Sequence, residues 1–368
     1  MRIAVVGAGV VGAATTAALR RAGADVTCFA GGAVMGERSA GSSRIFRLAH
    51  ADADLVRLAM RAREGFAAWA RRAGRPMVDR RGCVVSGGDA ADRAAAMERA
   101  GAACELVEPG DARLRLPVTA AARERIGGPV LVDPEGGVVD VDAVRALLRA
   151  EAGPAVVPEP VQGLDADPDR AAGARVRTAG GTHRFDAVVL AAGAGTPALA
   201  ARVGIAVPAA LVHHARFTFP FAEAPPSDAA DGGAASWPSW IDAPGDGLAT
   251  YQHRSGPGRW AVGGTVDPAL VAWEVGREAA VAASREVVLA HVRERLAVRP
   301  EVVETLYCHH TPDTGDGVTF RRAGPVVAVH GENLMKFAPV LGQDLAAAVL
   351  DGSTPRTAGT PEVHHPAR

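Results

Sequence analysis

The sequence predicts an α/β fold, α+β overall, with parallel strands near its N-terminus and an antiparallel sheet in its second half. Three patterns support this prediction. Residues 3–6 form a short apolar run that leads through a glycine-rich turn and a helix-like segment to a second apolar run at 26–29. Residues 186–195 repeat the apolar run and the glycine turn. From 209 to 264, apolar and polar residues alternate between Pro and Gly breaks, as is typical of antiparallel strands.

The remaining elements follow from periodicity in chain order. Residues 31–43 are small and polar and are expected to form a loop over a ligand. Helical spacing of apolar residues predicts helices at 54–73, 90–103, 141–152 and 339–350, and one or two helices at 268–298. Strands are expected at 81–86, 155–161, 174–178 and 302–310, with a hairpin at 318–329. Residues 353–368 lack periodicity and are expected to form an extended tail.

The glycines that follow the first strand give the clearest functional signal. Gly7, Gly9 and Gly12 have the spacing GxGxxG, and Val10 and Val11 complete the turn before a helix at 13–21. The first glycine permits a tight turn, the second lets the backbone approach a pyrophosphate, and the third lets the helix pack against the strand. The helix N-terminus attracts phosphate. The motif predicts a bound dinucleotide but does not by itself distinguish NAD from FAD.

One part of this dinucleotide pattern is missing. An Asp or Glu that binds the ribose hydroxyls is expected at the end of the second strand, where this chain has Ala30. The ribose is therefore expected to be held by another group or to be held less tightly.

Composition excludes several other functions. The net charge of −1 gives no reason to expect a nucleic-acid or membrane partner, and no apolar run is long enough to span a membrane. The four cysteines contain no CxxC pair, so we expect a reduced, cytoplasmic protein without a metal site.

Lysine is almost absent from the chain. Lys and Arg together number 40, and Lys336 is the one lysine among them. It lies in the apolar stretch 334–339, which argues against a solvated surface position. A functional role for its compact positive charge is therefore favoured over a chance remnant.

Six segments together resemble the D-amino-acid-oxidase-like flavoproteins, most closely the monomeric sarcosine oxidase and N-methyltryptophan oxidase family, of which the chain would be a divergent member. The segments are GAGVVG at 7–12, GSSRIFRLAH at 41–50, GGVVDVDAVRALL at 136–148, VVLAAGAGTPAL at 188–199, TPD at 311–313 and MKFAPVLGQDLA at 335–346. The resemblance implies FAD and two domains. The Rossmann-like FAD-binding domain would comprise 1–85, 136–208 and 311–368, and the substrate domain, built on an antiparallel sheet, would comprise 86–135 and 209–310.

The resemblance also implies a reaction. An amino-acid-like primary or secondary amine would be oxidised to an imine by hydride transfer to flavin N5, with peroxide formed if oxygen is the acceptor. In the family, an arginine and a C-terminal lysine bind the substrate carboxylate, and these positions are Arg47 and Lys336. A forked donor and a point charge suit such a clamp. Tyr251 is a further candidate for lining the substrate pocket, and His253 for acting near the flavin.

The residues expected to bind FAD lie in the matched segments. They are Gly7, Gly9, Val10, Val11, Gly12, Ser42, Ser43, Arg44, Ala192, Gly193, Met335 and Lys336. Arg44 is expected beside the flavin. The helix that starts near Pro339 is expected to direct its positive N-terminal dipole at the flavin pyrimidine edge, which favours reduction.

The chain departs from the family at the position of covalent flavin attachment. The cysteine that links the flavin in the family corresponds to Leu306 without a gap, or to Thr305 with a one-residue gap. Cys308 is nearby but two or three positions away. We therefore expect non-covalent FAD.

Two other departures concern charge near the flavin. The family lysine that promotes oxygen reduction is replaced by Ala261, so Arg259, His253 or His310 would have to supply a cation. The histidine expected three residues before the C-terminal lysine is Asn333.

Several functions stay open at this point. Ala261 allows a flavin dehydrogenase with an acceptor other than oxygen. An NAD-dependent dehydrogenase and a nucleotide-binding flavoprotein with a decayed catalytic site are further alternatives. The expected partners are a small amine that carries a carboxylate and an electron acceptor, bound to a monomer.

Overall fold

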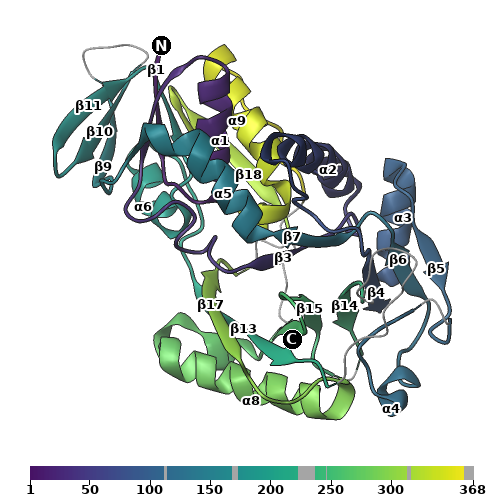
Figure 1. The fold of residues 1–368 in the computed structure, drawn as a ribbon. Coiled ribbons are helices and arrows are strands. Elements are labelled where there is room, and N and C mark those ends of the chain that lie inside the picture. Colours follow the sequence, from purple (N-terminus) through teal and green to yellow (C-terminus); the bar gives the residue numbers. More distant parts are fainter. Residues whose placement is uncertain (112–113, 168–172, 223–236, 246, 313–315, 360–368) are drawn as a thin grey trace.

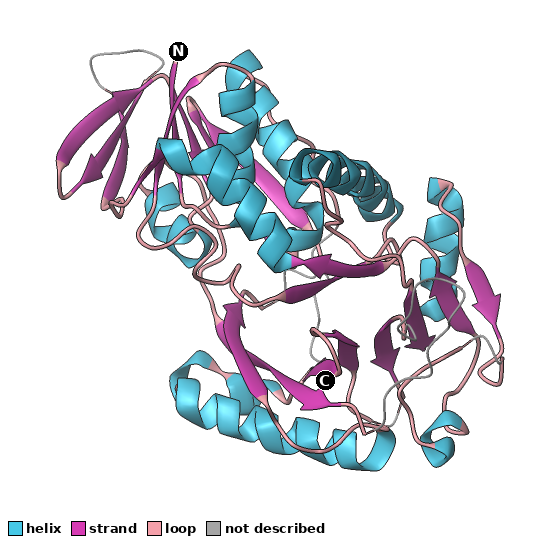
Figure 2. Cartoon of the chain, viewed as in Figure 1, coloured by secondary structure: helices cyan, strands magenta, loops and turns pink. Residues whose placement is uncertain are grey.

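The computed structural model of this chain describes residues 1–111, 114–167, 173–222, 237–245, 247–312 and 316–359. Helices surround two main sheets, one of six strands and one of eight (Figures 1 and 2). None of the described helices is long and apolar enough to cross a membrane. The predicted α/β fold class is confirmed.

The six-stranded sheet is built around β1 (Arg2–Val6). Its order is β18, β19, β12, β1, β2, β8, and all neighbours are parallel except β18 and β19. The other strands are β2 (Asp25–Phe29), β8 (Val156–Val157), β12 (Ala187–Leu190), β18 (Val318–Ala323) and β19 (Val326–Gly331). β1 and β12 are continuous apolar runs, because a central parallel strand is buried on both faces.

Helices cover one face of this sheet. α1 (Val10–Arg21) packs against α5 (Val141–Ala152) and α9 (Ala338–Asp351), and α2 (Ala53–Ala73) packs against α9 (Figure 1). The helix predicted at 13–21 starts earlier, at Val10, because Gly9 is the last residue with an extended backbone. Val10 and Val11 therefore belong to the first helical turn.

The opposite face of the sheet packs on smaller elements. Ala4 and Val6 of β1 share a core with Leu164 and Phe185, whereas Ile3 faces the helices. The elements on this side are a three-stranded antiparallel sheet of β9 (Gly163–Ala166), β10 (Ala174–Thr178) and β11 (Gly181–Phe185), with η2 (Gly193–Gly195) and α6 (Thr196–Ala201).

The eight-stranded sheet has the order β17, β13, β16, β15, β14, β4, β6, β5, and only β14 and β4 are parallel. Its strands are β4 (Cys83–Gly87), β5 (Glu105–Val107), β6 (Val130–Asp133), β13 (Val212–Pro220), β14 (Ser239–Ala243), β15 (Thr250–Arg254), β16 (Arg259–Gly264) and β17 (Glu304–His310). Phe217, Phe219 and Trp260 pack with residues of α8 (Arg277–Arg295). Since strand side chains alternate, Arg216 and His253 belong to the other face.

The remaining elements are short. They are α3 (Ala90–Ala100), α4 (Ala120–Arg123), α7 (Pro268–Val271) and the 3₁₀ helices η1 (Gly153–Ala155), η3 (Trp273–Val275) and η4 (Leu334–Phe337). The division into a cofactor domain and a substrate domain stays a prediction. The strand β4, which that division cuts at residue 85, pairs entirely within the eight-stranded sheet.

A two-stranded ribbon lies between the two main sheets (Figure 1). It pairs β3 (Ser43–Phe46) with β7 (Gly137–Asp140) in antiparallel register. β3 contacts β15 of the eight-stranded sheet and η4, which directly precedes α9. Residues at both ends of β3 are therefore placed where segments from distant parts of the chain meet.

The packing of α9 on α1 requires a glycine, which gives a test of the fold. A Cβ on Gly342 would lie 2.7 Å from the Cβ and the carbonyl carbon of Ala14. We expect Gly342→Ala to lower the free energy of unfolding by about 1–3 kcal/mol, because the helices must separate. Helix propensity alone would stabilise alanine by about 1 kcal/mol, so the sign of the change in urea denaturation tests the packing.

Gly110→Ala is the control for this substitution. A Cβ at Gly110 meets no atom within 4 Å, and Gly110 is not among the glycines with a positive φ. This variant should be neutral or slightly stabilising. A Gly342→Ala protein as stable as the control would contradict the close approach of α1 and α9.

Candidate functional site

The glycine turn has the shape that a pyrophosphate site needs. Gly7 has a φ of +102°, and a Cβ there would lie 2.4 Å from the carbonyl oxygen of Ala191. A Cβ on Gly12 would lie 1.9 Å from the carbonyl oxygen of Gly7. On Gly9, by contrast, it would meet only Ser39 Oγ, at 3.5 Å. The turn thus excludes side chains at two glycines and leaves space in front of the first turn of α1, so it fits a dinucleotide phosphate.

Ser39 belongs to this turn, although sequence analysis did not single it out. Its hydroxyl accepts a hydrogen bond of 3.0 Å from the backbone N–H of Val10. The loop at 31–43 is folded onto the turn, since Met35 N–H donates to the carbonyl oxygen of Ala8 at 2.9 Å. The polar composition of this loop was the available signal, but it did not identify which serine reaches the helix.

Ala192 and Gly193 lie beside the same turn. A Cβ on Gly7 would come within 2.9 Å of the Cα of Ala192, and Gly193 adopts a φ of +57° with no atom within 4 Å of its missing side chain. Met335 is buried in η4, which packs against α1, α2 and β3. Ala192 and Gly193 therefore lie against the glycine turn, whereas Met335 lies near the start of α9.

Ser42, Ser43 and Arg44 have a different position, at the contact between β3 and β15. Ser43 Oγ donates to Ser255 Oγ at 3.0 Å and lies 3.1 Å from His253 Nε2. Ser42 Oγ is 3.5 Å from Ser255 Oγ. The guanidinium of Arg44 donates to backbone carbonyls, including those of Ser43 and Ala40.

The structure brings Arg47 and Lys336 together at one side chain, Asp316. Lys336 Nζ lies 3.2 Å from Asp316 Oδ1, and Arg47 Nη2 donates to Asp316 Oδ2. Asn333 Nδ2 donates to Oδ1 at 2.7 Å, and His50 Nδ1 is 3.2 Å from Oδ2. We call these five residues the Asp316 cluster. Sequence analysis missed Asp316 and had no signal for it, because only the fold places this residue against Arg47, which follows β3, and Lys336 of η4.

The charges of the Asp316 cluster are strongly coupled. Burial lowers the pKa of Lys336 to about 7, and Arg47 adds to this effect while Asp316 opposes it. Burial alone would raise the pKa of Asp316, but Arg47 and Lys336 hold it well below its usual range. Burial and the same two cations lower the pKa of His50, so its imidazole is neutral. With Lys336 protonated, the cluster carries a net charge of +1.

Another buried cation is Arg216 on β13, which sequence analysis also did not identify. Its Nη1 donates to the carbonyl oxygen of Ser43 at 2.9 Å and lies 3.1 Å from His253 Nε2. Within the described part of the chain, its Nε and Nη2 and the Nδ1 of His253 have no hydrogen-bond partner. Burial and the charges of Arg216 and Arg44 lower the pKa of His253 well below its usual value, so this histidine is neutral.

Arg216 lies close to the position where the resemblance expects a lysine. His253 is paired in register with Ala261 on the neighbouring strand, and Arg216 contacts His253. Of the other expected substitutes, the side chain of Arg259 is exposed, and the ring of His310 packs 5.5 Å from that of His214. The fold thus offers a buried guanidinium next to Ala261.

Tyr251 lies in a neighbouring group of rings. Its hydroxyl is 2.6 Å from His214 Nε2, and burial raises the pKa of the phenol. Leu306 on β17 stands opposite Arg216, and Cys308 stands opposite His214. Cys308 is a free thiol whose pKa is raised by burial. Of the TPD segment, Asp313 lies outside the described residues.

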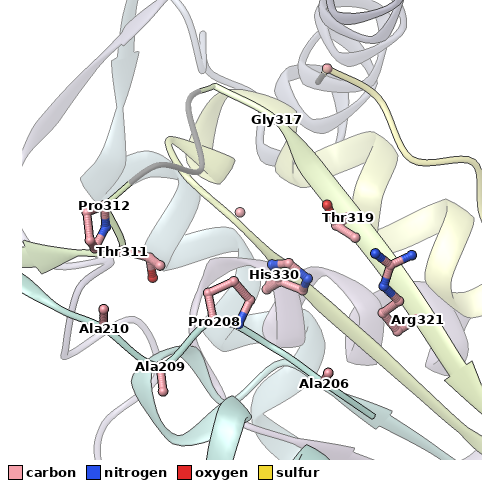
Figure 3. A pocket seen from close by; sticks show the side chains of 12 residues that line it. Ala206, Pro208, Ala209, Ala210, Thr311, Pro312, Gly317, Thr319, Arg321 and His330 are labelled. Atoms are coloured by element: carbon pink, nitrogen blue, oxygen red, sulfur yellow. The ribbon is translucent and has the colours of Figure 1, made fainter. Parts of the chain in front are cut away.

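A separate pocket of about 410 Å³ opens beside β18 and β19 (Figure 3). Thr319, Arg321 and His330 line one side of it, and the segment with Ala206 and Pro208 lines the other. Its lining includes Gly317, next to Asp316, but none of the residues predicted for the site.

Comparisons with known proteins agree with this geometry. Residues 2–348 match the DAO family, described as FAD dependent oxidoreductase. A search of curated proteins finds no match. Among solved structures, NikD, an unusual amino acid oxidase essential for nikkomycin biosynthesis, has a TM-score of 0.79 at 23% identity, over 98% of this chain and 99% of NikD.

Two further solved structures have the same fold. L-proline dehydrogenase from P. horikoshii has a TM-score of 0.72 at 17% identity, over 98% of this chain and 95% of that one. Glycine oxidase from Geobacillus kaustophilus has a TM-score of 0.70 at 18% identity, over 95% and 94% of the two chains. The family match identifies FAD rather than NAD as the cofactor. This chain therefore belongs to the DAO family of FAD-dependent oxidoreductases.

Proposed function

We propose that this enzyme oxidises a small amine that carries a carboxylate, as amino acids do, to the corresponding imine. One observation supports the proposal most directly, namely that Arg47 and Lys336, far apart in the sequence, reach the same carboxylate group of Asp316. A site that binds one carboxylate with these two donors has the chemistry to bind another. The amino acid oxidases and the dehydrogenase with the same fold are named for substrates of this class.

The residues of the glycine turn would hold the FAD phosphates. The first-turn N–H groups of α1 after Val10 and the hydroxyl hydrogen of Ser39 provide donors there, while Gly9 leaves the space. Ala192 and Gly193 border the same turn. When bound, FAD accepts the hydride that the amine carbon loses.

The protein's own contribution to the reaction is mainly positioning. Arg47 and Lys336 would fix the substrate carboxylate, which orients the carbon next to the amine. Arg47 is itself held in place because its Nε donates to the carbonyl oxygen of Ala49 at 3.1 Å. The buried imidazoles of His50 and His253 are neutral, so His50 adds no positive charge beside Asp316 and His253 adds none beside Arg216.

Arg216 would stabilise negative charge formed during the reaction. It is buried, it has unpartnered donors, and no carboxylate pairs with it within the described residues. A preorganised cation of this kind stabilises an anion that develops beside it. We propose that Arg216 replaces the lysine expected at Ala261, which favours oxygen as the acceptor. Peroxide output compared with dye reduction distinguishes oxygen from another acceptor.

Replacing the lysine tests the proposed carboxylate clamp. Lys336→Met should raise KM for the carboxylate substrate about 10- to 100-fold, because a charge-assisted hydrogen bond contributes ~1.5–3 kcal/mol. FAD should stay bound, as measured by the flavin absorbance of the purified variant. Arg61→Met is the control, since Arg61 is exposed and pairs with Asp344 on α9. Unchanged kinetics in Lys336→Met would refute the clamp.

Two arginine variants test whether Arg216 lacks a counter-ion in the protein itself. Arg216→Met should leave the free energy of unfolding of the FAD-free chain unchanged or raise it, because a buried charge is removed. Arg295 is similarly buried but lies 3.6 Å from Asp242, so Arg295→Met should lower this free energy by about 3–5 kcal/mol. If chemical denaturation shows that Arg216→Met and Arg295→Met lower the free energy of unfolding equally, a group of the protein itself neutralises the charge of Arg216.

The mode of FAD attachment can be read from the visible spectrum. Leu306 and Thr305 have no thiol, so acid precipitation should release the yellow flavin into the supernatant. Colour that remains in the pellet would contradict non-covalent binding. In that case a Cys308→Ser variant shows whether this thiol forms the link.

A further inference from the structure

The carboxylate of Asp316 occupies the position that the proposed clamp would give to a substrate. Its Oδ2 accepts from Arg47 and its Oδ1 lies 3.2 Å from Lys336 Nζ. The side chain is 20% exposed, whereas that of Lys336 is 4% exposed. Asp316 therefore lies on the more open side of two deeply buried cations.

The charges explain why a carboxylate is present there. Arg47 and Lys336 would repel each other in a low-dielectric site without an anion between them. Asp316 compensates one of the two charges and leaves a net charge of +1 when Lys336 is protonated. Asn333 donates a hydrogen bond to Oδ1, and His50 Nδ1 lies 3.2 Å from Oδ2, so the carboxylate is enclosed by side chains of the site.

A substrate carboxylate needs the same donors. Arg47 already uses Nε on the backbone of Ala49 and Nη2 on Asp316. Lys336 has no other carboxylate partner among the described residues. A second anion in the clamp must therefore share the charges of these two cations with Asp316 or displace it.

We propose that Asp316 is a specificity-determining residue, which competes with the substrate carboxylate for Arg47 and Lys336. This inference rests on the proposed function. A neutral amide or ester gains too little from the cations to displace an internal anion, whereas a carboxylate gains enough. Asp316 thereby restricts the site to substrates with an ionised carboxylate and weakens the binding of those substrates.

The test uses the holoenzyme with acetate as the probe and acetamide as its neutral counterpart. Because Lys336 is the single lysine, lysine labelled with ¹³C at Cε gives one NMR signal, and that signal comes from the site. Removing Asp316 lowers the pKa of Lys336 further, so acetate is titrated at a pH where the Cε signal shows that Lys336 is protonated. Under that condition acetate should bind Asp316→Asn about tenfold or more tightly than the wild type, because one nearby negative charge is removed. Acetamide binding should change far less.

Three variants separate the possible results. Arg47→Met should abolish the acetate-dependent shift of the Lys336 signal in both backgrounds. If it does, but Asp316→Asn leaves acetate affinity unchanged, the competition is refuted and the clamp stands. If Arg47→Met leaves acetate binding intact, the proposed function fails and the inference with it. Asp344→Asn removes a carboxylate paired with Arg61 and serves as the control, with no expected change.

A milder variant covers the case in which Asp316→Asn does not fold. Asn333 has a φ of +54°, which glycine adopts freely, so Asn333→Gly removes only the amide that holds Asp316 Oδ1. Acetate should then bind severalfold more tightly than in the wild type. An unchanged or weaker affinity would overturn the role of Asp316.

Discussion

Two cations buried side by side are costly unless an anion lies between them, and the Asp316 cluster is built on that constraint. Arg47 and Lys336 meet at Asp316, and the surrounding groups are arranged to keep the carboxylate ionised. The amide of Asn333 donates a hydrogen bond to this carboxylate and the neutral imidazole of His50 lies beside it, and neither group adds charge. The site thus carries a small excess of positive charge, which suits an anionic substrate.

The scaffold places this charge by bringing distant segments to one ribbon. β3 ends just before Arg47, and Asp316, two residues before β18, contacts Arg47. The 3₁₀ helix η4 contacts β3 and carries Lys336 directly into α9, which is fixed by its close packing on α1. The glycine turn and the cluster are therefore positioned by the same pair of helices.

At the other end of β3, near Ser43, a buried cation has no paired carboxylate among the described residues. Arg216 is buried beside Ser43 and His253, but within the described chain no carboxylate compensates it. The pair of Arg47 and Lys336 thus carries its own counter-ion, whereas Arg216, which shares the Ser43 carbonyl oxygen with Arg44, retains unused donors. This difference fits a division of labour in which the first site binds an anionic ligand and the second stabilises charge that appears only during the reaction.

Local sequence determined much of the fold. The GxGxxG turn, the apolar central strands, the helices and the antiparallel strands of the second half all follow from short-range periodicity and glycine geometry, and the structure confirms them. The sequence also pointed to Lys336 and Arg47, through a rare residue type and a family pattern. Ser39, Asp316 and Arg216 were decided by tertiary structure alone. Their importance comes from contacts between segments far apart in the chain and from burial, and neither of these leaves a periodic signal in the sequence.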